Sequence, residues 1–214
     1  MKRTIILGVL AIVVMTWAVP ATAQNTVSVR LTNVSKQIIS PPLLVTHTWK
    51  ARAFIPGNPA SDELAMLAED GDPMPLAALL SESDEVLDVV VSEGPLMPGD
   101  TLVFDLEKRG RFNRISAVGM LVTTNDAFFG VDNVFIEPGG QPQHVSAVAW
   151  DAGTESNNEL CDFIPGPPCG NPMVRDTAGA EGFIHVHPGL HGGGDLSTAE
   201  WDWQNPVVDI KIFK

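Results

Sequence analysis

The sequence predicts an all-β fold, an antiparallel sandwich or barrel, and two observations lead to this expectation. Nine short segments are rich in β-branched residues or alternate apolar and polar side chains. Clusters of Gly, Pro and Asn, such as "PGGQPQ" and "GPPCGNP", separate these segments. Many short strands joined by Gly- and Pro-rich turns are typical of antiparallel sandwiches and barrels.

The predicted strands follow one another along most of the chain. The first, "TVSVRLTNV", places Val27, Val29 and Leu31 on one face, because side chains in a strand alternate between the two faces. The nine segments, by residue number, are 26–34, 43–49, 85–92, 100–107, 114–123, 130–137, 144–150, 182–187 and 207–213.

One region has helical spacing instead. Ser61 or Asp62 is a candidate N-cap before an apolar repeat, and Gly71 is a candidate end of that helix. A second short helix is expected from Pro75, with apolar residues on one face. The apolar positions of the two helices are Leu64, Leu67, Ala68, Leu76, Leu79 and Leu80. We expect both helices to lie within a crossover between two strands.

The N-terminus resembles a cleaved secretory signal, which assigns residues 1–23 to a leader and 24–214 to one domain. Lys2 and Arg3 precede a short apolar run, and "ATA" precedes Gln24. We therefore expect a secreted or periplasmic protein, cleaved after Ala23, with no membrane span in the remaining chain. A length of about 190 residues suits a single domain.

The charge makes nucleic acid and anionic lipid poor partners. The chain has 26 acidic and 13 basic residues, a formal net charge of −13. Such a surface repels phosphate groups, whereas cations are natural partners. The acidity has an alternative explanation, since net charge also keeps exported proteins soluble.

The two cysteines, Cys161 and Cys169, enclose the Pro-rich segment "DFIPGPPC". Nearby cysteines in an oxidising compartment usually pair, so we expect a disulfide between them. Two thiolate metal ligands are the alternative, but the sequence lacks a second cysteine pair.

No catalytic motif indicates an enzyme. The sequence contains no G-x-S-x-G, no dinucleotide-binding fingerprint and no phosphate-binding loop. "HGGGD" at His191 resembles the oxyanion loops of esterases, but with no nucleophile motif we interpret its glycines as a flexible turn.

The histidines indicate a possible transition-metal site. In "HVHPGLH", His185 and His187 are expected on one face of a strand, and His191 could fold back towards it. Together with His47, these imidazoles could bind zinc or copper. The alternative is a hydrogen-bonded polar cluster at the end of a strand.

Two acidic loops indicate a calcium site. "TTNDAFFGVDN" contains Asp126 and Asp132. "WDAGTESNNE" contains Asp151, Glu155 and Glu159, with Gly153 allowing a sharp turn. Calcium takes six to eight oxygen ligands, which acidic loops at neighbouring strand ends can supply. Neither loop is an EF-hand, and acidic turns are also common on solvated surfaces.

Several segments resemble the spondin domain, in its bacterial form. They are "SPPLLVTH", "LAEDGDP", "LVTTNDAFFGVD", "WDAGTESNNELC" and "EGFIHVHPGLHGGGDL", and they span about Thr26 to Phe213. The most specific are "NDAFFGVD" and "WDAGTE". This domain, known from the matrix proteins F-spondin and mindin, is an antiparallel β-sandwich similar to C2 domains. It holds calcium in acidic loops at one end.

The resemblance implies that Asp126, Asp151 and Glu155 are the side-chain ligands of Ca²⁺. Glu155 stands where animal members have Asp, which lengthens the side chain but keeps the carboxylate. We expect backbone carbonyls and Asp132 to complete the shell. The thrombospondin-type repeats of the animal proteins are absent from the sequence, so their partners are not implied.

The sequence therefore predicts an exported calcium-binding module for binding or cell adhesion, without catalytic activity, whose extracellular or envelope ligand is unknown. Two alternatives remain. One is a metalloenzyme or metal carrier that uses His47, His185, His187 and His191, and the other is a structural envelope protein that binds no ion tightly.

Overall fold

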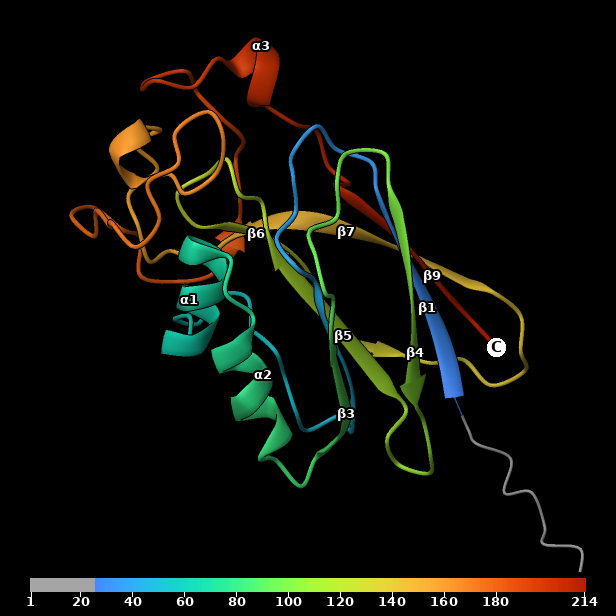
Figure 1. Cartoon of the computed structure of the whole chain (residues 1–214). Helices are drawn as coiled ribbons and strands as arrows, with labels where there is room; N and C mark the ends of the chain where they lie inside the picture. The colour runs from blue at the N-terminus through green and yellow to red at the C-terminus, as the bar shows by residue number, and fades with distance from the viewer. Residues whose placement is uncertain (1–25) are drawn as a thin grey trace, which may run out of the picture.

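A computed structural model describes residues 26–214 and confirms the all-β prediction (Figure 1). Within these residues, nine antiparallel strands form one nearly closed sheet. The strands are β1 (Thr26–Asn33), β2 (Leu43–His47), β3 (Val86–Val91), β4 (Thr101–Glu107), β5 (Arg114–Met120), β6 (Ala127–Phe135), β7 (Gln143–Asp151), β8 (His185–Val186) and β9 (Val208–Phe213).

The sheet folds back on itself at β7, which makes a sandwich. The strand order is β3-β2-β5-β6-β7-β9-β1-β4, and β8 pairs with β7 beside this path. The first half of β7, residues 143–147, pairs with β9. Residues 148–151 pair with β6, and residues 150–151 also pair with β8. Strand β7 therefore belongs to both layers and carries the chain from one to the other.

The two free edges of the sheet, β3 and β4, approach each other. The backbone N–H of Glu107 on β4 donates to Asp88 Oδ2 on β3 over 2.8 Å. The Thr46 hydroxyl donates to the Glu107 carbonyl over 2.7 Å. Side-chain hydrogen bonds thus connect the two edges at Glu107, where no backbone ladder joins them.

The main core lies between the layers, and a second core lies beneath the helices. Leu31, Leu44, Phe129 and Ile210 are fully or almost fully buried in the main core. Strand β2 is buried on both faces, because its alternate residues Leu43 and Val45 point into the second core, under the helices. This explains why β2 begins with three consecutive apolar residues, 43–45, instead of alternating.

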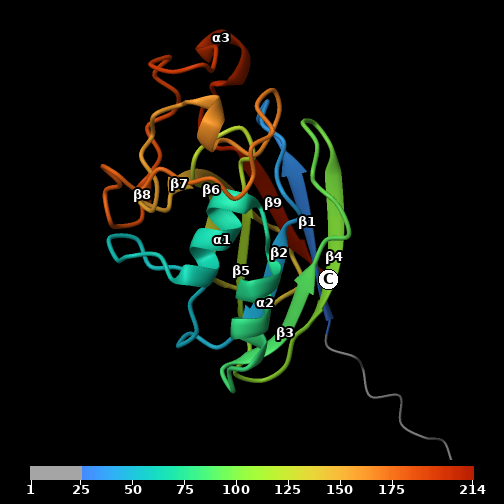
Figure 2. The same cartoon turned by 60° about the vertical axis from the view of Figure 1, so that its left-hand side comes forward.

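The helices α1 (Asp62–Asp70) and α2 (Met74–Ser81) connect β2 to β3 and cover one face of the sandwich (Figure 2). The predicted cap is confirmed, since Ser61 Oγ accepts a hydrogen bond from the backbone N–H of Leu64. Helix α1 ends at Gly71, whose φ of 69° is the left-handed conformation that glycine adopts without strain.

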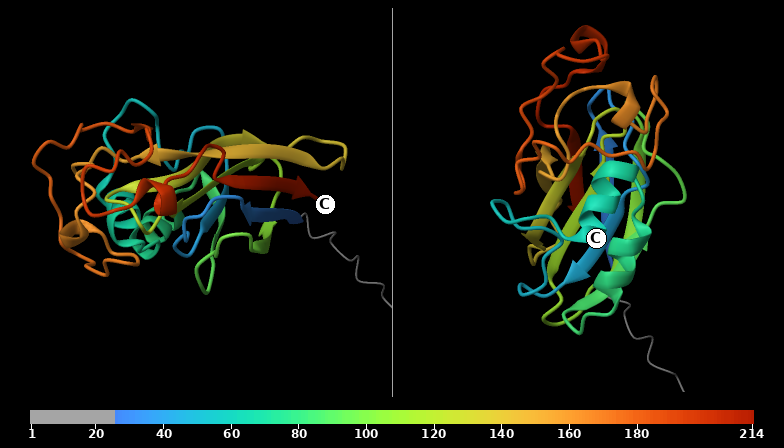
Figure 3. Two further views of the ribbon diagram at one scale, coloured as in Figure 1. Left: turned by 90° about the horizontal axis from the view of Figure 1, so that it is seen from above. Right: turned by 90° about the vertical axis from the view of Figure 1, so that its left-hand side faces the viewer.

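Two short helical segments were not expected: the 3-10 helix η1 (Cys161–Phe163) and α3 (Thr198–Trp201). The predicted strand 182–187 is only two residues long, and β6 begins three residues earlier than predicted. The long connections around these elements gather at one end of the sandwich (Figure 3). No helix within residues 26–214 is long and apolar enough to cross a membrane. The predicted leader lies outside the described residues.

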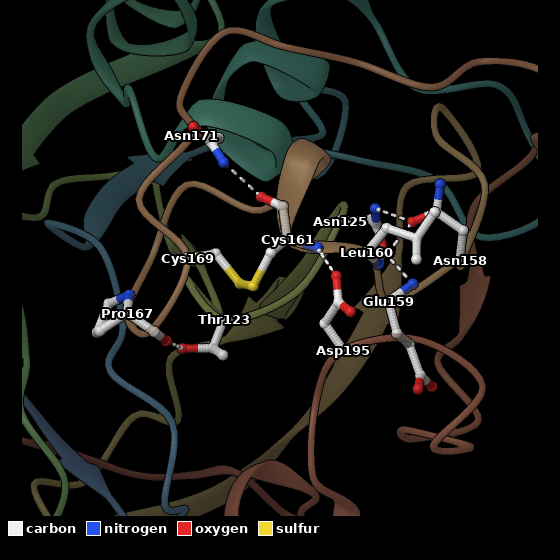
Figure 4. The surroundings of a disulfide bond; sticks show 10 residues. All are labelled: Thr123, Asn125, Asn158, Glu159, Leu160, Cys161, Pro167, Cys169, Asn171 and Asp195. Carbon is white, nitrogen blue, oxygen red and sulfur yellow. Dashed lines mark hydrogen bonds between the residues drawn. A yellow bond between two sulfur atoms is a disulfide. The ribbon is translucent and has the colours of Figure 1, made fainter.

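The predicted disulfide between Cys161 and Cys169 is present, with a Cα–Cα distance of 4.8 Å (Figure 4). Its loop is attached to the β5–β6 connection at two points. The backbone N–H of Gly166 donates to the Val122 carbonyl over 2.8 Å, and the Thr123 hydroxyl donates to the Pro167 carbonyl over 2.8 Å. The disulfide loop therefore supports the connection that carries Asp126.

We expect removal of the disulfide to destabilise the protein. The Cys161→Ser/Cys169→Ser double variant should lose about 2–3 kcal/mol in free energy of unfolding, the loop-closure term for a short loop. Urea denaturation of the oxidised wild type and the variant measures this difference. Labelling of unreduced, denatured wild type should find no thiol, and two reactive thiols per chain would contradict the pairing.

Candidate metal centre

Two buried carboxylates lie side by side at the loop end of the sandwich. Asp126 precedes β6 and Asp151 is the last residue of β7, and the antiparallel register places Ala127 opposite Asp151. Both aspartates are 0% exposed. The strand pairing therefore brings together two acidic side chains that are 25 residues apart in the sequence, as predicted.

The Asp126 carboxylate has one satisfied oxygen and one unsatisfied oxygen. Its Oδ2 accepts hydrogen bonds from the backbone N–H groups of Thr154 (2.8 Å) and Glu155 (3.1 Å) and from the Thr154 hydroxyl (3.2 Å). Its Oδ1 is buried and has no hydrogen-bond partner. An unpaired carboxylate oxygen in the interior is costly. Oδ1 is therefore the oxygen of this carboxylate that is free to bind a cation.

Gly153 allows the 152–155 segment to wrap around Asp126. Its φ is +68°, and a Cβ at this position would lie 2.4 Å from the Phe183 carbonyl oxygen. Only glycine fits this close approach without displacing the backbone. The turn lets successive N–H groups of the segment face the carboxylate.

Asp151 is held by the residues that follow it, Gly153 and Asn157. Its Oδ1 accepts from the backbone N–H of Gly153 over 2.7 Å, and its Oδ2 accepts from the side-chain amide of Asn157 over 2.6 Å. The carboxylate oxygens of Asp151 and Glu181 and a ring nitrogen of His185 all lie within 4.8 Å of one another. Among the described residues, these are the only three His, Cys, Asp or Glu side chains whose ligand atoms lie this close together.

Glu155 is 1% exposed, and its acidic neighbours are Asp126 and, on helix α1, Glu69. Its Oε1 accepts from the backbone N–H of Asp176 over 2.8 Å. On the α1 side, Arg175 forms ion pairs with Glu69 and Asp70. Glu155 therefore belongs to the same buried acidic region as the two aspartates, although it is outside the compact group.

Burial raises the pKa of all three predicted ligands. Burial, and then the neighbouring Asp151, raise the pKa of Asp126 to about 7. Burial, and then Glu69 and Asp126, raise the pKa of Glu155 to about 8. The pKa of Asp151 is also raised, chiefly by burial. These shifts mean that the nearby positive charge, such as that of Arg175 beside Glu155, does not offset the cost of burying the ionised carboxylates.

His185 and His187 meet at Asp151, which agrees with their predicted common face. The Nε2 atom of each ring lies 3.9 Å from Asp151 Oδ2. His187 is buried, and burial lowers its pKa to about 3, with the nearby His185 and His191 acting in the same direction. His187 is therefore neutral at physiological pH.

The expectation that His47 joins this cluster is wrong. His47 pairs with Arg114, which lies opposite Phe135 at the far end of β6. At about 3.3 Å per residue, the nine residues of β6 separate His47 from the centre by more than 20 Å. Its ring is hydrogen-bonded to the Thr48 carbonyl (2.7 Å) and the Ser116 hydroxyl (2.8 Å), as a core histidine.

Asp132 also does not complete the predicted shell. It lies on β6, six residues from Asp126, and forms an ion pair with Arg52. Its Oδ1 accepts from the backbone N–H of Ala53 (2.7 Å) and from the Ser116 hydroxyl (2.9 Å). The carboxylate is thus committed to the 52–53 segment and β5.

The glycine-rich segment after His191 is tied down, which corrects its interpretation as a flexible turn. The buried Glu159 carboxylate accepts hydrogen bonds from the backbone N–H groups of His191, Gly192 (2.7 Å) and Gly193 (3.0 Å). A Cβ on Gly194 would lie 2.4 Å from the Glu159 carbonyl oxygen. The glycines therefore form an anion-binding nest that is filled by a carboxylate of the same chain.

Sequence reasoning missed Glu181, Asn157 and Asp176, all of which contact the centre. They lie in the long connection between β7 and β8, where no periodic pattern indicates a position in space. No model of a known protein family and no curated protein matches this chain.

Without a metal ion, the protein should lose stability as the pH rises from about 7 to 9. Folded Asp126 and Glu155 keep their protons up to pKa values of about 7 and 8, whereas unfolded Asp and Glu titrate near roughly 4. The folded state then binds more protons than the unfolded state, so the free energy of unfolding falls with pH.

The fall in stability is measured above pH 7 because the buried histidines have the opposite effect on stability at lower pH. The lowered pKa of His187 makes stability rise with pH, but only up to the unfolded value near 6.5. Melting temperatures in chelator measure the trend. Asp126→Asn/Glu155→Gln should flatten it, and Asp84→Asn, on an exposed turn, should preserve it. A melting temperature that rises over this window would contradict the assignment.

Proposed function

We propose that this chain is an exported calcium-binding module of the spondin type that acts in binding or adhesion without catalysis. The observation that carries the proposal is the buried Asp126 Oδ1, which has no partner beside a second buried carboxylate, Asp151. A bound cation supplies the missing partner and the missing positive charge at once.

The arrangement around Asp126 suits a hard cation. Three donors from Thr154 and Glu155 fix Oδ2, which leaves Oδ1 as the free ligand oxygen. Asp151 and Glu155 supply further carboxylate oxygens, and loop carbonyls can add to them. Calcium accepts many oxygen ligands in flexible geometry, so it tolerates the longer side chain of Glu155.

The other features of the chain agree with this function. The disulfide is compatible with an extracellular or periplasmic location. The ordered connections at one end of a rigid sandwich form the kind of surface through which scaffolded loops bind partners. The binding or adhesion role itself comes from the resemblance to the spondin domain, and the partner stays undefined.

Calcium should raise the melting temperature of the wild type. Extracellular calcium modules bind with dissociation constants of roughly 0.1–1 mM. A free concentration a hundredfold above the dissociation constant stabilises the folded state by about 2.7 kcal/mol. For a chain of this size, that corresponds to a rise of about 5–10 °C. Differential scanning fluorimetry with stepwise calcium addition after chelation measures it.

Two aspartate variants separate the site from general salt effects. Asp126→Asn should lose most of the rise while keeping the fold in chelator, because Asn keeps the side-chain shape but not the charge. Asp84→Asn, on the turn between α2 and β3, should respond to calcium as the wild type does. Sodium at equal ionic strength should have little effect. An unchanged wild-type melting temperature at about 10 mM calcium, well above the expected range, would refute the proposal.

A further inference from the structure

A second group of metal-binding atoms lies on the other side of Asp151 from Asp126. Asp151 at the end of β7 and His185 on β8 are directly paired in register, and Glu181 lies in the connection that leads into β8. The ligand atoms of the three residues lie within 4.8 Å of one another. Asp151 is buried, His185 is partly exposed and Glu181 is exposed, so the group opens towards solvent.

The hydrogen bonds of His185 leave its Nε2 free to bind a metal. Nδ1 lies 3.3 Å from the Phe183 carbonyl oxygen, which can only accept, so the proton belongs on Nδ1. Nε2 then carries a lone pair and faces Asp151 Oδ2 at 3.9 Å. This is the arrangement of metal-binding histidines, whose second nitrogen donates to a carbonyl or carboxylate.

His187 has the opposite proton arrangement. Its Nδ1 accepts from the backbone N–H of Gly189 over 3.0 Å, so its proton is on Nε2. Nε2 lies 3.0 Å from Asn157 Oδ1 and donates to it. Neither nitrogen of His187 therefore has a lone pair available for an ion beside Asp151.

Asn157 connects His187 to the carboxylate of Asp151, and the proton on His187 Nε2 determines the orientation of the Asn157 amide. Because its Oδ1 accepts from His187, its amide N–H groups point to Asp151 Oδ2 (2.6 Å) and Glu181 Oε1 (3.5 Å). Without the donor on His187, the amide could turn over and present its oxygen to the two carboxylates. His187 thus decides which way Asn157 faces.

We propose that Asp151, Glu181 and His185 form a binding site for a borderline divalent ion such as zinc. In this site His185 Nε2 is the imidazole ligand, and His187 is a positioning residue that orients Asp151 through Asn157.

The ligand types define the class of ion. One imidazole and two carboxylates suit zinc and its neighbours in the first transition series, whereas calcium takes oxygen ligands. Three protein ligands leave a coordination position for water or an external ligand. The site shares only Asp151 with the proposed calcium centre, so the two proposals can fail separately.

Zinc titration calorimetry on the chelator-treated protein at about pH 7.5 tests the site, because imidazole is unprotonated there. The wild type should bind one zinc with a dissociation constant well below millimolar. His185→Ala and Glu181→Gln each remove a ligand of the ion. They should weaken zinc binding by more than about 10-fold, the smallest effect typical of residues that only hydrogen-bond to a ligand. The Glu181 side chain is exposed, so Glu181→Gln should not affect folding.

His187→Phe and His187→Gln test the positioning role. Phe keeps the packing against Trp203 but removes the donor, and should weaken zinc binding by about 10–100-fold. Gln can place an amide donor near the position of Nε2 and should recover most of the affinity. The effects of His187→Phe and Asn157→Ala should not add, because both act on the same carboxylate.

The controls distinguish the site from surface binding and from the calcium centre. His144→Ala removes an exposed histidine elsewhere and should leave zinc affinity unchanged. Asp126→Asn should remove the calcium response but keep zinc binding. Millimolar or weaker zinc binding by the wild type, or wild-type affinity in Glu181→Gln or His185→Ala, overturns the site. X-ray absorption that finds two imidazoles on the zinc, or His187→Gln as weak as His187→Phe, overturns the role of His187.

Discussion

The pairing of β6 with β7 is the constraint on which the candidate centre depends. Because Ala127 lies opposite Asp151, the preceding Asp126 is next to Asp151 in a region from which water is excluded. Burial raises the pKa of both carboxylates, and the neighbouring Asp151 adds to the shift of Asp126. A fold that keeps two acids in this position accepts a cost in stability unless a cation compensates it. The centre is therefore a consequence of strand register, and the loops refine it.

The connections at this end of the sandwich bury a few apolar side chains, such as Ile164 and Leu196, and are also fixed to one another by polar contacts. The Asn125 amide donates to Asn158 Oδ1, and Asn125 Oδ1 accepts from the backbone N–H of Glu159. Glu159 binds the glycine-rich segment, and Asp195 accepts from the backbone N–H of Cys161, at the disulfide (Figure 4). Together these contacts link the β5–β6 connection, the segment after β7, the glycine-rich segment and the disulfide loop. This explains how long irregular segments can hold metal-binding atoms in place.

Strand and helix positions could be predicted because local patterns determine them. The alternation of Val27, Val29 and Leu31 and the Ser61 cap depend only on neighbouring residues. Asp126 and Asp151 could also be predicted as candidate ligands, since acidic residues near strand ends form a visible pattern in the sequence. The roles of Glu181, Asn157 and Glu159 could not be predicted. These residues lie in the 33-residue connection between β7 and β8, and their roles depend on contacts with residues distant in the sequence. Likewise, His185 and His187 look equivalent in sequence, and only their hydrogen bonds distinguish them.

The central claim is that Asp126 Oδ1 faces a cation. Its most direct test is a crystal structure of calcium-loaded protein, with the ion located by anomalous scattering. The account predicts an anomalous peak about 2.3–2.6 Å from Asp126 Oδ1, with further oxygen ligands from the 151–155 segment. A structure without a peak at this end, in which a water molecule or a backbone N–H satisfies Oδ1 instead, would contradict it.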